Sequence, residues 1–140
     1  MQLSPHFTLE EFTFSETASR LGIKNDVPEN LMPNAKKTAQ ALEIIRDILG
    51  APITVSSCYR SQLLNKAVGG KSNSAHLNAL AADFVCRGYG TPEQIVKKLA
   101  RDGMGRGLVY DQLIIEYGRW VHLGLAQFDK DARFQVLTIG

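Results

Sequence analysis

The chain has 140 residues, of which 44% are hydrophobic and 21% charged, a composition typical of one globular domain rather than a disordered segment. Its 16 basic and 14 acidic residues leave a formal net charge of +2, and no cluster of lysine or arginine suggests a nucleic-acid partner. No apolar stretch approaches the ~20 residues of a membrane-spanning helix, so we expect no membrane insertion.

The first third of the chain predicts helices. Thr8 to Glu11 reads Thr-Leu-Glu-Glu, a capping box that opens a short helix. Ser15 is the expected cap of a second short helix that ends at Gly22. Between residues 28 and 49 apolar side chains recur at steps of three and four, so the longest helix is expected there, with Gly50 as its stop.

The rest of the chain predicts a small sheet interrupted by two helices. The helices are expected at residues 61–68 and from Thr91 to about residue 101. A hairpin turn is predicted at Gly118-Arg119, and the expected strands cover residues 52–56, 80–86, 107–110, 112–117, 120–126 and, at the sheet edge, 134–139. Helices thus precede antiparallel strands, so the predicted class is α+β, in a single domain over residues 1–140.

Two features of the sequence bear on the compartment. Cys58 and Cys86 show no Cys-x-x-Cys spacing, and we interpret them as buried, reduced thiols. The N-terminus lacks a basic start followed by an apolar run, so no secretory signal is predicted. We therefore expect synthesis in the cytoplasm, and a substrate outside the cell would require another route of release.

The chain has three histidines, and two of them are candidate metal ligands. His6 has no acidic or cysteine neighbour in the sequence and is interpreted as a surface residue. His76 stands in a polar loop, seven residues before Asp83, and a catalytic zinc site needs three such ligands and one open position. Because seven extended residues span roughly 23 Å, His76 and Asp83 can share a metal only if the chain folds back.

Asp83 and His122 are polar residues in apolar surroundings. Asp83 interrupts the apolar run of residues 79–85, where a carboxylate costs several kcal/mol unless it is paired or binds a metal. An ion pair with an arginine and a ligand role both remain open. Strand alternation sends Val121 and Leu123 to one face and His122 to the other, where it is either structural or a ligand.

Two further residues are candidates for catalysis. Glu116 ends an apolar strand, and amide hydrolysis needs a base to take a proton from water. It shares a face with His122 if the intervening turn has an odd number of residues, but not if the turn has two; Asp111 is the alternative base. Arg60 stands where a strand gives way to a helix and is either a carboxylate clamp or a surface arginine.

Taken together, these segments resemble a known family. The chain is similar to the zinc D-alanyl-D-alanine carboxypeptidase group, which includes the LAS-type peptidoglycan peptidases and phage endolysins. The stretch His6-Phe7-Thr8-Leu9-Glu10-Glu11-Phe12 resembles small phage and prophage members. The resemblance covers nearly the whole chain and rests on Tyr59-Arg60-Ser61, Asn65, Val68-Gly69-Gly70, Ser74-Ala75-His76, Ala81, Asp83 and Trp120-Val121-His122.

The resemblance implies a fold and a site. The fold is α+β, with N-terminal helices packed on a small antiparallel sheet, as in Hedgehog and D,D-peptidase domains. The resemblance also implies a substrate-steadying arginine, matching Arg60, and a zinc ion held by His76, Asp83 and His122. In several branches the base lies three residues before the last ligand, where this chain has Arg119, so Glu116 is the base we expect. Two glycines common among relatives are replaced here, by Cys58 and Ala79.

The expected function is zinc-dependent hydrolysis of a peptide bond in peptidoglycan stem peptides, by a monomer acting in the periplasm or cell wall after release. The reaction is that of a D,D-carboxypeptidase or of an L-alanyl-D-glutamate or cross-link endopeptidase. The alternative is a non-catalytic wall-binding or phage structural module that keeps the fold, and the absence of a carboxylate at Arg119 favours it. A Hedgehog-type signalling domain is disfavoured by the phage-like N-terminal motif and the absence of a signal peptide.

Overall fold

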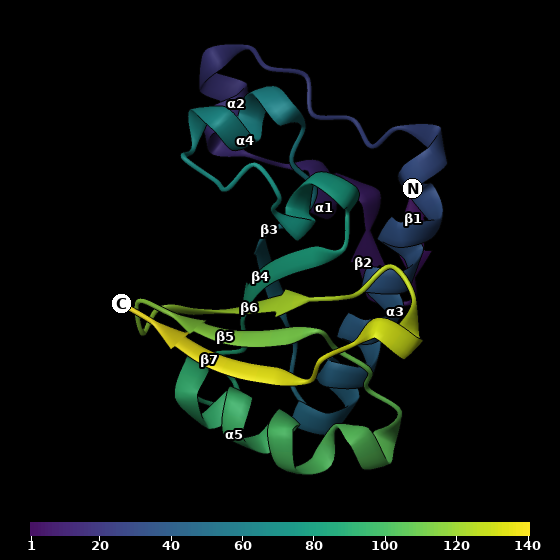
Figure 1. The fold of residues 1–140 in the computed structure, drawn as a ribbon, viewed down its shortest axis with the longest axis vertical. Helices are drawn as coiled ribbons and strands as arrows, with labels where there is room; N and C mark the ends of the chain where they lie inside the picture. The colour runs from purple at the N-terminus through teal and green to yellow at the C-terminus, as the bar shows by residue number, and fades with distance from the viewer.

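The structure is a computed structural model that describes residues 1–140. It is mixed α and β, which confirms the α+β class (Figure 1). A five-stranded sheet has the order β3-β4-β6-β5-β7, and a separate hairpin pairs β1 with β2. The strands are β1 (Gln2–Ser4), β2 (Phe7–Thr8), β3 (Thr54–Ser57), β4 (Ala81–Val85), β5 (Gln112–Glu116), β6 (Trp120–Gly124) and β7 (Gln135–Ile139).

Local capping chemistry accounts for the helix boundaries. The Thr8 capping box opens α1, Ser15 caps α2, and Gly22 ends α2 at a φ of 68°, as predicted. The predicted long helix begins as a short 3-10 turn and continues as α3, which ends at Gly50. The helices are α1 (Leu9–Thr13), α2 (Glu16–Leu21), α3 (Met32–Leu49), α4 (Gln62–Ala67) and α5 (Pro92–Asp102), and the 3-10 turns are η1 (Glu29–Leu31), η2 (Ala75–Asn78), η3 (Met104–Arg106) and η4 (Asp129–Asp131).

The sheet differs from the prediction in three places. Residues 107–110 form no strand, because Gly107 leaves η3 at a φ of 86° and the Leu108 amide bonds back to the Gly103 carbonyl. The β1–β2 hairpin had no predicted counterpart. The last edge strand, β7, exists as expected, but it pairs with β5 in parallel, so the sheet is mixed rather than antiparallel.

The register of the central strands gives the sheet two unlike faces. Strand β6 pairs with both β4 and β5, so Ala82, Leu123 and Leu113 lie side by side on one face. That helix-covered face joins α3 and α5 in one core, to which Phe84, Val121, Leu42, Ile45, Ile95 and Leu99 also belong. The opposite face carries Asp83 next to His122, and it is this face that holds the candidate site.

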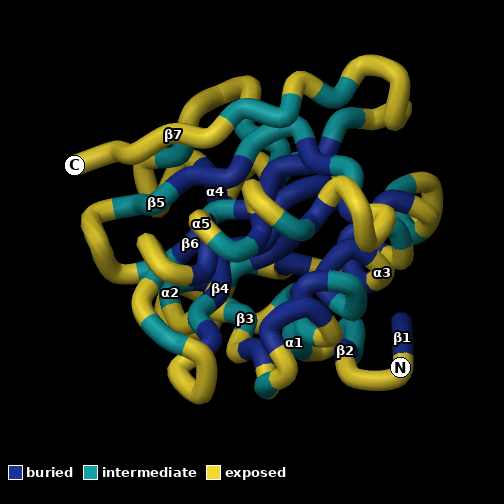
Figure 2. The backbone as a smooth tube through the Cα atoms, turned by 90° about the horizontal axis from the view of Figure 1, so that it is seen from below, coloured by how far each residue is buried: buried dark blue, intermediate teal, exposed yellow.

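Burial follows the same division. Buried residues concentrate where β4, β6 and α3 lie, whereas most of β7 is exposed (Figure 2). Helices α2 and α4 contact each other beyond the β3 end of the sheet (Figure 1). None of the helices has both the length and the apolar character that crossing a membrane would require.

Candidate metal centre

Asp83 lies in the middle of the sheet, on β4 between β3 and β6. Its register partners are Ser57 on one side and His122 on the other. Since neighbouring residues of a strand point to opposite faces, the buried Ala82 and Phe84 direct Asp83 away from the core. The alternation predicted for β6 likewise sends His122 to the face opposite the buried Val121 and Leu123.

A sharp reversal of the chain brings His76 to Asp83. His76 stands in η2, whose first turn is capped by the Ser74 hydroxyl, and η2 ends at Ala79 in a left-handed conformation with a φ of 58°. The Thr38 hydroxyl donates to the Ala79 carbonyl at 2.7 Å and holds this reversal against α3. A non-glycine residue in this conformation costs about 1–2 kcal/mol, so the fold holds Ala79 where glycine would be unstrained.

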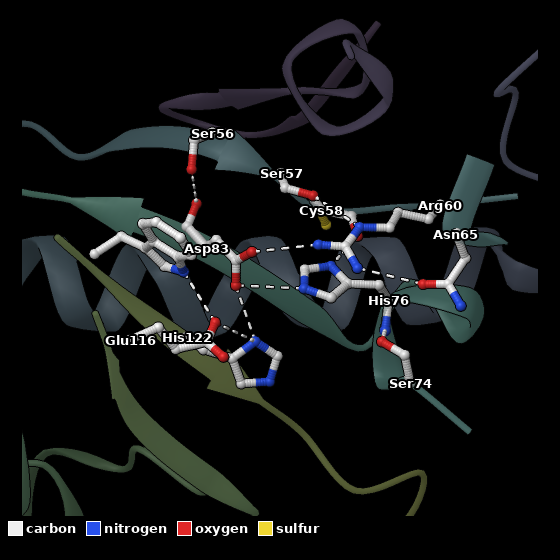
Figure 3. Close-up of polar contacts among 11 residues, drawn as sticks. Ser56, Ser57, Cys58, Arg60, Asn65, Ser74, His76, Asp83, Glu116 and His122 are labelled. Atoms are coloured by element: carbon white, nitrogen blue, oxygen red, sulfur yellow. Dashed lines mark hydrogen bonds and ion pairs between the residues drawn. The ribbon is translucent and has the colours of Figure 1, made fainter. Parts of the chain in front are cut away.

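The three donor atoms lie close enough together to share one zinc ion. His76 Nε2 lies 3.3 Å and His122 Nδ1 2.9 Å from Asp83 Oδ1, and all three atoms lie within 4.8 Å of one another (Figure 3). Ligands at 2.0–2.1 Å from a tetrahedral zinc ion lie roughly 3.3 Å apart. Two imidazoles and one carboxylate are also a donor set that suits zinc and leaves one position open. The residues present therefore fit the ion.

Hydrogen bonding fixes which nitrogen of His76 faces the cluster. Its Nδ1 lies 2.5 Å from the carbonyl oxygen of Cys58, and because a carbonyl only accepts, the imidazole donates there. Nε2 then keeps its lone pair for a metal, an arrangement common to histidine ligands. His122 instead presents Nδ1 to Asp83.

The cluster is buried and charged. Burial raises the pKa of Asp83, but its interactions with the neighbouring imidazoles of His122 and His76 outweigh it, so the pKa lies below its usual range and the carboxylate stays ionised. Burial raises the pKa of the neighbouring Cys58 thiol, which therefore stays protonated and offers no thiolate. Cys58 and Cys86 are free and buried, as predicted.

The β5–β6 hairpin places Glu116 on the same face as His122. Glu116 pairs with Trp120, so the turn comprises three residues, and Tyr117 and Gly118 both adopt positive φ. The turn is one residue longer than the predicted Gly118-Arg119 turn. Its odd number of residues is the case in which Glu116 and His122 share a face. Glu116 Oε1 lies 3.9 Å from His122 Nδ1 and accepts a hydrogen bond from Trp120 Nε1 at 2.9 Å.

Arg60 borders the cluster from the side of β3. One terminal nitrogen lies 3.6 Å from Asp83 Oδ2, so Asp83 has an arginine partner as well as two imidazoles. Nε donates to the Ser57 hydroxyl, and the other terminal nitrogen donates to Asn65 Oδ1, both at 3.3 Å (Figure 3). Sequence reasoning missed these contacts of Ser57 and Asn65, since neither residue type signals such a role.

Two other polar residues considered from the sequence have partners away from the cluster. Asp111, the alternative base, pairs with Arg133 at 2.7 Å. His6 is exposed as predicted, but it pairs with Glu43 of α3 at 2.7 Å, a neighbour that is distant in sequence. Neither residue belongs to the three-donor cluster.

Comparison with protein families gives a match over most of the chain. A family model described as Peptidase M15 matches residues 5–124. The matched range begins before the Thr8 capping box, ends with β6, and includes Arg60, the three clustered donors and Glu116. No curated protein matches the sequence.

Proposed function

Since the chain belongs to the peptidase M15 family, we propose that it is a zinc peptidase that hydrolyses a peptide bond in the stem peptides of bacterial peptidoglycan. The observation that carries this proposal is the convergence of His76 Nε2 and His122 Nδ1 on Asp83 Oδ1, at distances of 3.3 and 2.9 Å that suit ligands of one zinc ion. The family supports a zinc-dependent peptidase, and the substrate and the bond that is cut are our proposal.

Each polar residue of the site has a role in this proposal. Bound zinc supplies Lewis acidity, which polarises a carbonyl group and lowers the pKa of water to about 7. Trp120 engages Oε1 of Glu116, so Oε2 is the oxygen free to take a proton from the attacking water and later give it to the departing amine. Arg60 binds a carboxylate of the stem peptide.

The arrangement of Glu116 also bears on the non-catalytic alternative. That alternative rests on Arg119, which stands where several branches of the related group carry their base. Here Arg119 lies in the exposed turn, while the Glu116 carboxylate is 3.9 Å from His122 Nδ1. A carboxylate beside the cluster supports catalysis, with the protein acting in the periplasm or cell wall, where its substrate lies.

The test is digestion of purified peptidoglycan followed by mass spectrometry of the released muropeptides. We expect products that a chelator abolishes and added zinc restores. Released D-alanine would indicate a D,D-carboxypeptidase, and shortened or uncross-linked stems an endopeptidase. Glu116→Gln is expected to keep zinc but to lose roughly 10²–10⁴-fold in turnover. The absence of any chelator-sensitive product from every wall chemotype would reject the proposal.

A further inference from the structure

Arg60 is held by three different groups at its three guanidinium nitrogens. Ser57, Asn65 and Asp83 each contact one nitrogen, at 3.3, 3.3 and 3.6 Å. The guanidinium has five N–H groups, so at least two remain for a further acceptor. The Arg60 side chain is thus held in one direction while some of its N–H groups stay free for a ligand.

Asn65 is the amide member of this set and is itself held firmly. It is buried in α4, with 4% of its surface exposed. The side-chain Nδ2 of Asn65 donates to the Lys71 carbonyl at 2.9 Å, and the backbone carbonyl of Asn65 accepts from the Gly70 amide at 2.8 Å. The loop after α4 therefore closes around the Asn65 amide and leaves Oδ1 directed at Arg60.

Gly70 is the residue that lets this loop approach so closely. A Cβ atom at Gly70 would lie 2.0 Å from Asn65 Oδ1 and 3.0 Å from an Arg60 terminal nitrogen. Contacts below 3 Å force something to move, and both nearby groups belong to the Arg60–Asn65 hydrogen bond. Any other residue at position 70 would therefore displace the Asn65 amide from this hydrogen bond.

Arg60, which lies 3.6 Å from Asp83 Oδ2, also lines a pocket formed by the start of α2, the end of β3 and part of α4. The pocket has a volume of about 260 Å³, and its lining includes Ser56, Ser57, Tyr59 and Phe14. It is large enough for part of a short peptide, and its charged lining residues are one cation, Arg60, and one anion, Glu16. The ligand class that suits it is a peptide with a free carboxylate.

We propose that Asn65, kept in place by Gly70, is a positioning residue that aims Arg60 at a substrate carboxylate in this pocket. The inference rests on the proposed function, because it assumes a peptide substrate. It adds Asn65 and Gly70 as the residues that orient the Arg60 guanidinium toward a carboxylate. Asn65 acts through Arg60 and has no contact with the metal ligands among its hydrogen bonds.

A double-mutant cycle tests this inference. Arg60→Gln, Asn65→Ala and the double variant are assayed on synthetic stem peptides in which each free carboxylate is replaced in turn by an amide. We expect Asn65→Ala to raise KM for the recognised carboxylate peptide by about tenfold to a hundredfold with little change in kcat. The KM for the corresponding amide peptide should not change. The double variant should have the same KM for the carboxylate peptide as Arg60→Gln alone.

Two further variants separate positioning from a general loss of structure. Gly70→Ala should reproduce the effect of Asn65→Ala, since it displaces the same hydrogen bond. Asn34→Ala is the matched control: Asn34 is also buried and bonds to the Asn78 carbonyl and Gln127, away from Arg60. It should leave the acid-to-amide preference unchanged.

A spectroscopic readout separates failure of this inference from failure of the proposed function. The ¹⁵N–¹H signal of Arg60 Nε needs no substrate, and we expect Asn65→Ala and Gly70→Ala to shift or broaden it while Asn34→Ala does not. An unchanged signal, or losses from Arg60→Gln and Asn65→Ala that add in full, would overturn the inference. If the protein has no peptidase activity but the Arg60 signal still responds to the variants, the substrate assignment is rejected and the positioning contact is retained.

Discussion

His6 and Glu43 form an imidazole–carboxylate pair at the surface, whereas His76, Asp83 and His122 form a cluster on the sheet. The surface carboxylate is bonded on both oxygens by groups of the protein: the Ser4 hydroxyl and the His6 amide at one, and the His6 ring at the other. In the cluster a single oxygen of Asp83 faces two imidazole nitrogens, with a charged arginine beside the other oxygen.

This difference shows what separates a structural pair from a candidate metal site. The Glu43 pair fastens the β1–β2 hairpin to α3, and one imidazole is enough for that task. The Asp83 cluster draws donors from η2, β4 and β6 and buries two of its three members. Convergence of several donors on one point, rather than the presence of histidine beside a carboxylate, is the informative feature.

The largest effect should come from removing the shared carboxylate. Asp83→Asn keeps the shape of the side chain but takes the anionic ligand from both imidazoles, and zinc affinity should fall by more than about a hundredfold, since even indirect changes around a zinc ligand cost 10–100-fold. Competition with a chromophoric chelator measures it. Glu43→Gln is the control and should bind zinc like the wild type; equal affinities in all three proteins would contradict the assignment.

An intermediate effect is expected from Trp120→Phe. Glu116 is a third carboxylate near an imidazole, and the Trp120 indole holds its Oε1 at 2.9 Å. Without that bond the carboxylate is less well placed, so kcat should fall by about tenfold, a fraction of the 10²–10⁴ that general-base catalysis contributes. Zinc affinity should not change. Steady-state kinetics and metal analysis decide the matter, and full activity would show that Trp120 does not position Glu116.

The smallest effect concerns stability at the surface pair. Burial opposes ionisation of Glu43, but bonds from Ser4 and His6 outweigh it and lower its pKa below the ordinary 4.5. A carboxyl whose folded pKa is depressed stabilises the fold above its unfolded pKa and loses that contribution as the pH falls through the folded value. Glu43→Gln should therefore destabilise by about 1 kcal/mol or less at neutral pH, and by nothing in acid.

Denaturant unfolding at about pH 7 and at a pH well below the ordinary carboxyl range measures this difference. The pH-dependence is the test, because a loss of packing alone would destabilise the Glu43→Gln variant equally at both values. Zinc should be absent from both samples, so that the buried cluster contributes to the wild type and the variant alike.

Local chemistry explains which parts of the fold could be predicted from the sequence. The Thr8 and Ser15 caps act within one turn, and the alternation around His122 is visible in six residues, so these predictions needed no tertiary contacts. The parallel pairing of β7 depends on a partner more than 20 residues away, for which no local signal exists. Residues 107–110 have a strand-like composition, yet the preceding turn directs the chain so that they do not pair with the sheet.

The candidate site divides in the same way. Residue type and apolar surroundings singled out His76, Asp83 and His122, and the structure brings them together. The sequence does not decide whether the hairpin turn has an odd or an even number of residues. The answer depends on Tyr117 adopting a positive φ, which a tyrosine does not predict. The contacts of Arg60 with Ser57 and Asn65 were missed for a similar reason: the hydrogen bond that Arg60 donates to Asn65 depends on how the loop ending at Gly70 closes.

The pairing of Asp83 with His122 across β4 and β6 also has a consequence for how the molecule is made. A slip of one residue between these strands would turn one of the two side chains to the opposite face and separate them. Chains that refold with the wrong strand alignment would therefore lack affinity for zinc. In a refolded preparation, the molar ratio of bound zinc to protein would count the correctly assembled molecules before any substrate is known.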